Sequence, residues 1–448
     1  MLGAAALTIV LFSIAVFAIN RLMQEAWAYE KVSTWIKTYE VERHDDGSWE
    51  AIKVQRPFTH PTNDNYLSWD AEHYNQIRQY LYDPTRSWHG NFAFFPLFPL
   101  LWRTLNASPL GIATINWLLW IVGIVLLILT FGKRGSPTAA MLMFCAPMLV
   151  VFMIPYSEAL FFACASLGIF GFSKKCYPLY FIGFMLAACT RAAGNLLIVA
   201  WLVTDIIIAL RNKETFSVTA KRTLLHLLPI VAGVAAVIIF QKIRGAEHWF
   251  QYVIAQREWG KSLSWPSWPL SDWSDEGKSI THPLLYGLFI PAIAWLAVQV
   301  FNPAKTDVDS PHSRHYQLRL LCVLIFVGNI VLALFTQHGS MYSQARLLTC
   351  TPFFFYLVLD FSTTKIERRW LILLSAFLLI AISVCFKMFF KADSLGYLIT
   401  IAFIVLVFIA QRLNKTALTV AISMLLLLNA WWTAYLVNCF VNGGWIFT

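Results

Sequence analysis

Long apolar segments separated by short polar ones run through almost the whole chain. A helix that crosses the hydrocarbon core of a bilayer needs about 20 predominantly apolar residues. On that measure the sequence predicts an all-α polytopic membrane protein, a single integral membrane domain over residues 1–448 with about thirteen transmembrane helices, within a range of roughly 11–14. The expected helices are residues 4–22, 110–131, 137–154, 158–173, 177–190, 194–210, 223–241, 283–301, 318–336, 347–361, 370–388, 395–411 and 416–437.

Lys and Arg residues are divided unevenly between the two sides of these helices. If the N-terminus is cytoplasmic, the short loops on that side carry 16 Lys and Arg, whereas those on the other side carry 4. Cytoplasmic loops of membrane proteins are enriched in positive charge. We therefore expect a cytoplasmic N-terminus, an uncleaved first helix and two long extracytoplasmic loops, residues 23–109 and 242–282.

Composition excludes several classes of protein. With 58% hydrophobic and 13% charged residues, the chain is not an ordinary soluble globule. The net charge of +10 comes mostly from Lys and Arg between apolar segments, so it indicates orientation rather than nucleic-acid binding. Neither long loop contains any of the 8 Cys, which argues against a disulfide framework and a paired-Cys metal site. No Gly-rich phosphate loop follows a strand, which disfavours a soluble nucleotide-sugar enzyme.

Each long loop has its own pattern. In the first, residues 41–54 alternate in polarity around Asp46-Gly47, which predicts a β-hairpin. The second is rich in Trp and contains Pro266 and Pro269. Two interpretations of the second loop stay open: an interfacial anchor, or a lid that guides lipid.

The first long loop also concentrates the candidate chemistry, in residues 66–74 and 91–99. An acid, a base and a cation among aromatic rings, beside a membrane, suit a polar group carried on a lipid. The prolines of 94–99 prevent a regular helix, so we expect an apolar wall there. The candidate polar residues are Asp70, Glu72, His73 and Arg78, and the candidate wall residues are Trp69, Tyr74, Phe94, Phe95 and Pro96.

Each polar candidate also has a structural interpretation. Asp70 is equally well placed to be a general base or the N-cap of a helix over 71–82. Glu72 is expected to be solvated or paired with Arg78 or His73. His73 is expected to form structural hydrogen bonds rather than bind metal, because no second ligand stands at helical spacing.

Ionisable residues also lie at the expected extracytoplasmic ends of the helices: Glu158, Arg191, His338 and Arg346. Such groups are costly at membrane depth and are functional candidates by default. Glu158 is a candidate supporting residue, or a simple partner of Arg191. For Arg191 and Arg346 two interpretations stay open. The first is an ion pair or snorkelling, and the second is phosphate binding by the guanidinium fork.

Three motifs resemble those of the class V GPI mannosyltransferases and their prokaryotic relatives, glycosyltransferases of the GT-C superfamily. They are Trp69-Asp70-Ala71-Glu72-His73-Tyr74, Asn91-Phe92-Ala93-Phe94-Phe95-Pro96 with Pro99, and Tyr156-Ser157-Glu158-Ala159-Leu160-Phe161. Thr190-Arg191 with Gly194, and Arg346 with Pro352, match more weakly. These matches occur in the family's order and extend from residue 66 to residue 352.

The resemblance implies a GT-C-type fold and an inverting mannosyltransferase that acts on the extracytoplasmic face. The donor would be a polyprenyl-phosphate sugar, the acceptor a hydroxyl of a lipid-linked or glycolipid molecule, and Asp70 the general base. Arg346 is the first candidate for the departing phosphate, with Arg191, His338 and Arg78 as weaker ones, because cations stabilise developing negative charge. No metal or cofactor is assigned, although a weakly bound divalent cation stays open.

Two other functions remain as alternatives. A transporter or flippase of lipid-linked sugars would be marked by inverted repeats and half-helices that meet at the midplane, which we do not find in the sequence. A membrane scaffold would leave the one-sided acids and arginines unexplained. The expected location is a bacterial inner membrane, with the endoplasmic reticulum membrane as the alternative.

Overall fold

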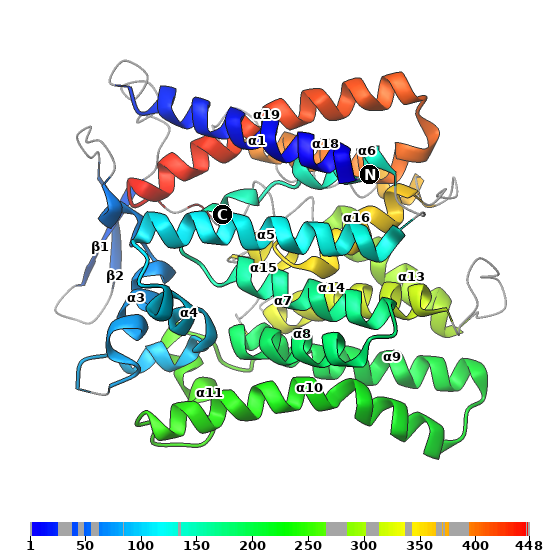
Figure 1. Ribbon diagram of the computed structural model, residues 1–448, viewed down its shortest axis with the longest axis horizontal. Coiled ribbons are helices and arrows are strands. Elements are labelled where there is room, and N and C mark those ends of the chain that lie inside the picture. The colour runs from blue at the N-terminus through cyan, green and yellow to red at the C-terminus, as the bar shows by residue number, and fades with distance from the viewer. Residues whose placement is uncertain are drawn as a thin grey trace.

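The computed structural model describes residues 2–25, 38–43, 49–54, 62–83, 85–132, 136–265, 285–301, 313–336, 343–363, 370, 372–375, 394–444 and 446. Within these residues the chain is almost entirely helical, and most of the long helices run side by side (Figure 1). Helix α1 (Leu2–Met23) packs along α19 (Lys415–Val441), and α10 (Phe216–Ile243) packs on α8 (Tyr177–Thr190) and α9 (Leu196–Asn212).

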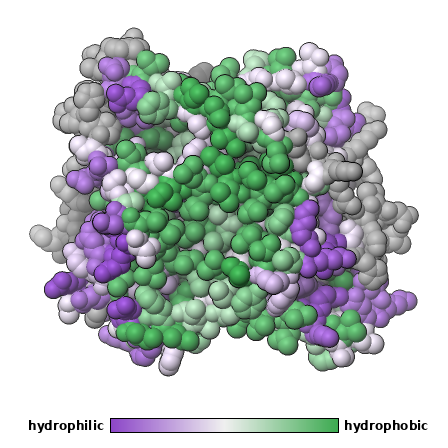
Figure 2. Space-filling model, viewed as in Figure 1, coloured by the Kyte–Doolittle hydropathy of each residue, from purple (hydrophilic) through white to green (hydrophobic). Residues whose placement is uncertain are grey.

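Seven of the described helices are long and apolar enough to cross a membrane. Figure 2 shows an apolar band across the middle of this face, with hydrophilic residues gathered toward both sides. The chain is therefore a polytopic membrane protein, whereas the total of thirteen helices and the GT-C fold stay predictions. The seven helical segments are Leu2–Met23, Pro109–Phe131 (α5), Ala192–Asn212, Phe216–Ile243, Arg314–Thr336 (α14), Leu395–Arg412 and Lys415–Val441.

Shorter helices complete the bundle and form one of its ends. The apolar ones are α7 (Glu158–Ser173), α8, α13 (Ile290–Phe301) and α16 (Pro352–Thr363). The other α-helices include α3 (Asp70–Tyr80), α4 (Leu97–Leu105), α6 (Pro137–Leu142), α11 (Gln251–Ala255), α15 (Gln344–Thr349) and α18 (Ser394–Ile409). A π-helix, η9 (Leu285–Phe289), precedes α13. The described 3-10 turns are η1 (Asn63–Tyr66), η2 (His89–Ala93), η4 (Met143–Cys145), η5 (Leu149–Met153), η6 (Ala192–Asn195), η7 (Gln256–Trp259) and η12 (Ala410–Arg412).

The predicted hairpin in the first long loop is confirmed. Strands β1 (Thr38–Arg43) and β2 (Trp49–Val54) pair antiparallel, with Thr38 opposite Val54 and Arg43 opposite Trp49. The strands lie on either side of Asp46-Gly47, as the alternating pattern predicted, and residues 44–48 between them are outside the described part of the chain.

The prediction of a single helix over residues 137–154 is wrong. Helix α6 ends at Leu142, and the chain continues through 3-10 turns and irregular backbone to Tyr156. Irregular backbone at membrane depth must find hydrogen-bond partners inside the protein. Asn116 Nδ2 donates to the carbonyls of Ile154 and Tyr156, and Asn429 Nδ2 donates to those of Phe144 and Ala146. Two buried asparagines thus replace the missing helical hydrogen bonds.

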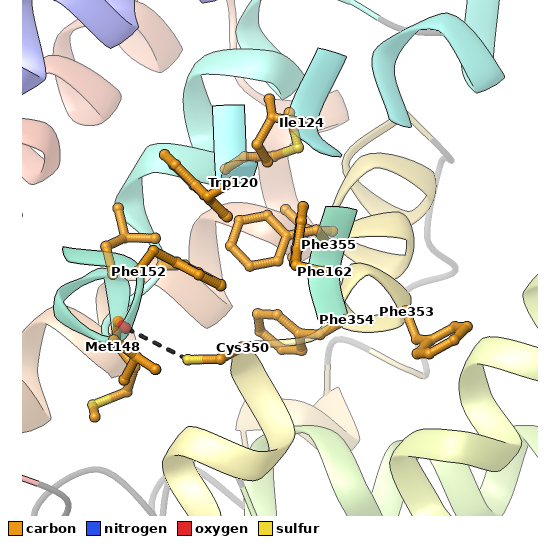
Figure 3. Close-up of a cluster of buried hydrophobic side chains, with 14 of the residues drawn as sticks. Trp120, Ile124, Met148, Phe152, Phe162, Cys350, Phe353, Phe354 and Phe355 are labelled. Atoms are coloured by element: carbon orange, nitrogen blue, oxygen red, sulfur yellow. Dashed lines mark hydrogen bonds between the residues drawn. The ribbon is translucent and has the colours of Figure 1, made fainter. Parts of the chain in front are cut away.

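An aromatic cluster packs around this irregular segment (Figure 3). The Trp120 ring of α5 stacks on Phe152 with centroids 5.2 Å apart, and Phe162 meets Phe355 edge-on, also at 5.2 Å. Cys350 Sγ donates to the Met148 carbonyl at 3.5 Å, just before α16 begins. The predicted helix over 347–361 is divided at this point, since α15 ends at Thr349 and α16 starts at Pro352.

Helices α7 and α8 approach each other closely through glycine. A Cβ on Gly183 would lie 2.3 Å from the backbone nitrogen of Gly168, closer than any real side chain is found. Small residues let neighbouring membrane helices come into backbone contact. Because Glu158 starts α7 and Arg191 directly follows α8, this close packing helps to bring their backbones together at one end of the bundle.

Candidate functional site

Asp70 is the first residue of α3, at the end of the bundle that also carries α4, α11 and the hairpin (Figure 1). The preceding residue, Trp69, has φ 58° and ψ −130°, a backbone conformation that non-glycine residues rarely adopt. Two contacts from other segments hold this corner: Trp69 Nε1 donates to the Gly444 carbonyl at 3.1 Å, and the Asp70 N–H donates to Tyr156 Oη at 3.3 Å.

The interpretation of Asp70 as a helix N-cap is wrong. The helix begins at Asp70 itself, and the capping position is Trp69, which forms no side-chain capping bond. The Asp70 carboxylate instead accepts a hydrogen bond at Oδ2 from Arg346 Nη1, 2.8 Å away. Its other oxygen, Oδ1, makes no hydrogen bond to a residue that the structure describes. A carboxylate that caps nothing and keeps one oxygen open is suited to accept a proton.

Glu158 extends this contact into a chain of four charged residues. Its Oε1 lies 3.1 Å from Arg346 Nε and 2.5 Å from Arg191 Nη1. These contacts are at ion-pair distance but lack the angles of hydrogen bonds, and Oε2 has no hydrogen-bond partner among the described residues. The order is thus Asp70–Arg346–Glu158–Arg191, with two negative and two positive charges.

Burial differs strongly between the two carboxylates of this chain. The side chain of Glu158 is 1% exposed, whereas that of Asp70 is 19% exposed. Asp70 is therefore the carboxylate that a substrate can reach, and Glu158 lies beneath it between the arginines. Glu158 also begins α7, where the helix dipole favours a negative charge.

The two arginines lie in short segments between longer helices. Arg191 follows α8 in an extended conformation (φ −151°, ψ 148°), and Arg346 lies in the two-turn helix α15. The Arg346 guanidinium also lies over the Tyr156 ring, 5.2 Å from its centroid. Buried ion pairs need such additional contacts to offset the desolvation of their charges.

Lys261 is a functional candidate that the sequence analysis missed. Burial lowers the pKa of its ammonium group, as do the nearby Arg346 and Arg191, while Asp70 partly opposes them. Backbone N–H groups of Ser262 and Ser264 donate to the carbonyls of Thr336 and Phe335, which join this segment to the end of α14. In the sequence, only the Trp and Pro residues of this loop were candidates. Its lysine lies within electrostatic reach of Asp70, Arg191 and Arg346.

His73 lies in an aromatic surround on α3. Its Nδ1 is 2.8 Å from Asn91 Oδ1, its ring stacks on Phe94 at 5.3 Å, and Trp259 meets it edge-on at 4.9 Å. Trp259 Nε1 in turn donates to the Gly90 carbonyl. The Trp-rich loop and the first long loop therefore share one aromatic cluster, with His73 at its centre.

The remaining wall candidates also join the first loop to other segments. The Tyr74 hydroxyl is 2.6 Å from Ser157 Oγ, and burial raises the pKa of Tyr74. Phe95 is buried edge-on against Tyr252 at 5.3 Å, and Pro96 is buried at the start of α4. These contacts give the apolar residues beside Asp70 defined positions. The expectation that the prolines of 94–99 prevent a regular helix is wrong from Leu97 on, because Pro99 lies in the first turn of α4, where its missing N–H would have no helical partner.

Three other candidates either make their contacts away from the Asp70–Arg346–Glu158–Arg191 chain or lie outside the described residues. Glu72 is exposed on another face of α3, and Gln76 Nε2 lies 3.5 Å from it. Arg78 donates to Asn75 and lies over the Trp102 ring at 5.2 Å, so its contacts are not with the four-residue chain. His338 lies outside the described residues.

Within the described part of the chain, no group of three or more His, Cys, Asp and Glu side chains is arranged to hold a metal ion. The four-residue chain contributes two carboxylates, and each is already in contact with an arginine.

No protein-family model, no curated protein and no solved structure matches this chain. The relationship to the class V mannosyltransferases therefore remains a prediction from short motifs.

Proposed function

We propose that this protein is an inverting glycosyltransferase that moves a sugar, mannose by the motif resemblance, from a polyprenyl-phosphate donor to a hydroxyl group of a lipid-linked or glycolipid acceptor. The observation that carries the proposal is the Asp70–Arg346 contact of 2.8 Å at one end of a bundle of apolar helices. A proton acceptor and a phosphate-binding cation must both lie next to the anomeric carbon in such a reaction.

In the proposed reaction Asp70 Oδ1 accepts the proton of the acceptor hydroxyl. The hydroxyl oxygen forms a bond to the anomeric carbon from one side while the bond from that carbon to the phosphate oxygen breaks on the other. The electron pair of the broken bond leaves with polyprenyl phosphate, and the configuration at the anomeric carbon inverts. Asp70 fits this role better than Glu158, because Glu158 is buried between two arginines.

The cations around Asp70 would receive the departing phosphate. Arg346 binds Asp70, so a donor phosphate would compete with Asp70 for this guanidinium. That exchange would release the carboxylate for proton transfer when the donor is in place. Arg191 and Lys261 supply further positive charge at the same site.

The proposed location is a bacterial inner membrane, with the endoplasmic reticulum membrane as the alternative and the Asp70 end extracytoplasmic in both. The lipid chain of the donor would lie among the apolar helices, with its head group beside Trp69, Tyr74 and Phe94. Aromatic rings at the interface suit a ligand with an apolar tail and a polar head.

Sugar transfer by the purified chain is the direct test. We expect labelled polyprenyl-phosphate-mannose to label a lipid acceptor from a panel of glycolipids and lipid-linked hydroxyl compounds. Movement of the donor across a vesicle membrane without transfer would identify a transporter instead. If neither sugar transfer nor movement of the donor is observed, the result would favour a scaffold.

Changing Arg346 to Lys is expected to weaken donor binding about tenfold while the protein stays folded. Lys keeps the positive charge but loses the bidentate fork that matches a phosphate group. The apparent affinity for labelled donor measures the change, and Arg257→Lys, at an exposed position of η7, is the matched control. Unchanged donor affinity in Arg346→Ala would remove this residue from the donor site.

The proposed orientation predicts which introduced cysteines an impermeant thiol reagent can reach in intact cells. Thr85→Cys and Glu247→Cys, both at exposed positions near the Asp70 end, should react. Ser217→Cys, near the start of α10 at the other end, should react only after permeabilisation. The parent chain controls for its own cysteines. Labelling of Ser217→Cys alone in intact cells would reverse the orientation.

A further inference from the structure

A second polar site lies at the end of the bundle opposite Asp70. Glu158 and Ser173 are the first and last residues of α7, so about 22 Å of helix axis separates them. Helix α14 spans the same two ends: Thr336 accepts a hydrogen bond from Ser262 beside Lys261, and Arg314 begins the helix about 33 Å away. The two ends are therefore about as far apart as the two faces of a bilayer.

A cavity of about 240 Å³ opens at this second end, between α5, α7, α14 and α16. A water molecule occupies about 30 Å³ of liquid, so the cavity has room for a tetrahedral anion with water. Among the residues that the structure describes, its polar lining has two basic side chains and four hydroxyl groups, from Arg314, His315, Thr130, Ser173, Ser313 and Tyr356.

Among the described residues, the carboxylate next to this cavity is occupied by its own partners. Asp360 is 1% exposed, and its Oδ1 lies 2.7 Å from His315 Nε2, while its Oδ2 accepts from Arg319 Nε at 2.5 Å. Asp360 does not line the cavity. Arg319 offsets its negative charge, so the charge that faces the cavity comes from Arg314.

The groups that line the cavity are held in fixed orientations. His315 Nδ1 is 2.6 Å from Tyr356 Oη, so Asp360 and Tyr356 hold the imidazole ring from both sides. Arg314 donates to the Phe172 carbonyl and lies over the Phe172 ring at 5.0 Å. This leaves further guanidinium N–H groups, because Arg has five donors. The start of α14 adds the positive end of a helix dipole.

We propose that this cavity is a binding site for a phosphate group, separate from the donor site at Asp70. The proposal rests on the basic and hydroxyl lining of the cavity and on the pairing of the nearby Asp360 with Arg319 and His315. Arg314 supplies the charge, and the Ser173 and Ser313 hydroxyl groups supply neutral donors, since the Thr130 hydroxyl donates to the Leu126 carbonyl and the Tyr356 hydroxyl contacts His315. The phosphate belongs to an anionic phospholipid head group of the adjacent leaflet or to a soluble phosphate compound at that face. Both present the same tetrahedral oxygens to the cavity.

The test is the melting temperature of the purified full chain in dodecylmaltoside micelles, because a ligand that binds only the folded protein stabilises it in proportion to its affinity. One arm titrates inorganic phosphate against chloride at equal ionic strength. The other adds phosphatidylglycerol against diacylglycerol. Stabilisation by inorganic phosphate identifies a soluble ligand, and stabilisation by phosphatidylglycerol alone identifies a lipid head group.

Three variants separate this cavity from other anion sites, including Arg346. Arg314→Gln removes the charge, and Ser173→Leu fills the cavity but keeps every charge. Both should weaken the affinity at least about tenfold, as expected for loss of a charge-assisted hydrogen bond or of the space itself. Lys221→Gln, an exposed basic position near the same end on α10, should bind like the parent.

The outcomes decide the proposal. It is overturned if neither ligand stabilises the parent, or if Ser173→Leu binds as tightly as the parent. Loss of affinity in Lys221→Gln equal to that in Arg314→Gln would show a general effect of surface charge and would also overturn it. If Arg314→Gln fails to fold, Ser173→Leu decides alone. Sugar transfer plays no part in this readout, so failure here and failure of the glycosyltransferase proposal are distinguishable.

Discussion

Asp70→Asn is expected to lower sugar transfer by about 10²–10⁴-fold without unfolding the protein, because it removes the proposed proton acceptor and keeps nearly the same shape. The Asp70 carboxylate caps no helix end, so its loss costs no capping bond. The amide oxygen can still accept from Arg346. Transfer rates, donor binding and the melting temperature of the same preparation measure the effect.

Donor binding by Asp70→Asn gives a second, independent readout. In the proposed mechanism, the donor phosphate competes with Asp70 for Arg346, which Asp70 contacts in the structure. A neutral amide competes less well than a carboxylate, so the variant should bind donor as tightly as the parent or several-fold more tightly. A dead variant that also loses donor affinity would indicate a positioning role for Asp70 rather than proton transfer.

Glu72→Gln is the matched control, since it makes the same chemical change two residues away on an exposed face of α3. It should retain most of the parent's activity. If Asp70→Asn turns over within a few-fold of the parent and Glu72→Gln does not, the base is Glu72 and the proposed mechanism is wrong.

Glu158→Ala is expected to destabilise the protein by about 3–5 kcal/mol, the usual cost of removing one partner of a buried ion pair. The variant would leave Arg191 and Arg346 next to each other without the carboxylate that lies between them. The free energy of unfolding in micelles measures this loss. Glu247→Ala, an exposed carboxylate near the same end, should change stability by no more than about 0.5 kcal/mol.

The double variant Glu158→Ala with Arg191→Ala tests the cause. It removes one charge of each sign, so it should be less destabilised than the sum of the two single variants. Additive effects would show that Glu158 and Arg191 do not interact as an ion pair. A melting temperature of Glu158→Ala equal to that of the parent would contradict the buried-pair interpretation altogether.

The hydrophobic pattern alone predicted the membrane class and most of the long helices. Segments such as 4–22, 110–131 and 416–437 lie within α1, α5 and α19. About 20 apolar residues without a break can satisfy their backbone only as a helix in lipid, so this information is local. The pairing of the two hairpin strands was predictable for a similar reason, because the alternation of polarity around Asp46-Gly47 is a local signal in the sequence.

The irregular segment from Met143 to Tyr156 was not predictable from its own residues. Its apolar composition is that of a membrane helix, and side chains distant in the sequence, Asn116 and Asn429 above all, donate to carbonyls that a helix would have paired. Hydropathy measures whether a segment can be buried, not which partners satisfy its backbone. Tertiary contacts therefore decided this part of the fold.

The sequence by itself determined which residues could form the site, because acids and arginines at the ends of apolar helices are few and costly. Only the tertiary structure decided how they pair. Asp70 and Arg346 are far apart in the chain, yet Asp70 Oδ2 lies 2.8 Å from Arg346 Nη1. Lys261 comes within electrostatic reach of both from a loop in which only the Trp and Pro residues had been candidates. The choice between a cap and a base at Asp70 also depended on that pairing, since a carboxylate's role is set by the donors around it, and these come from other helices.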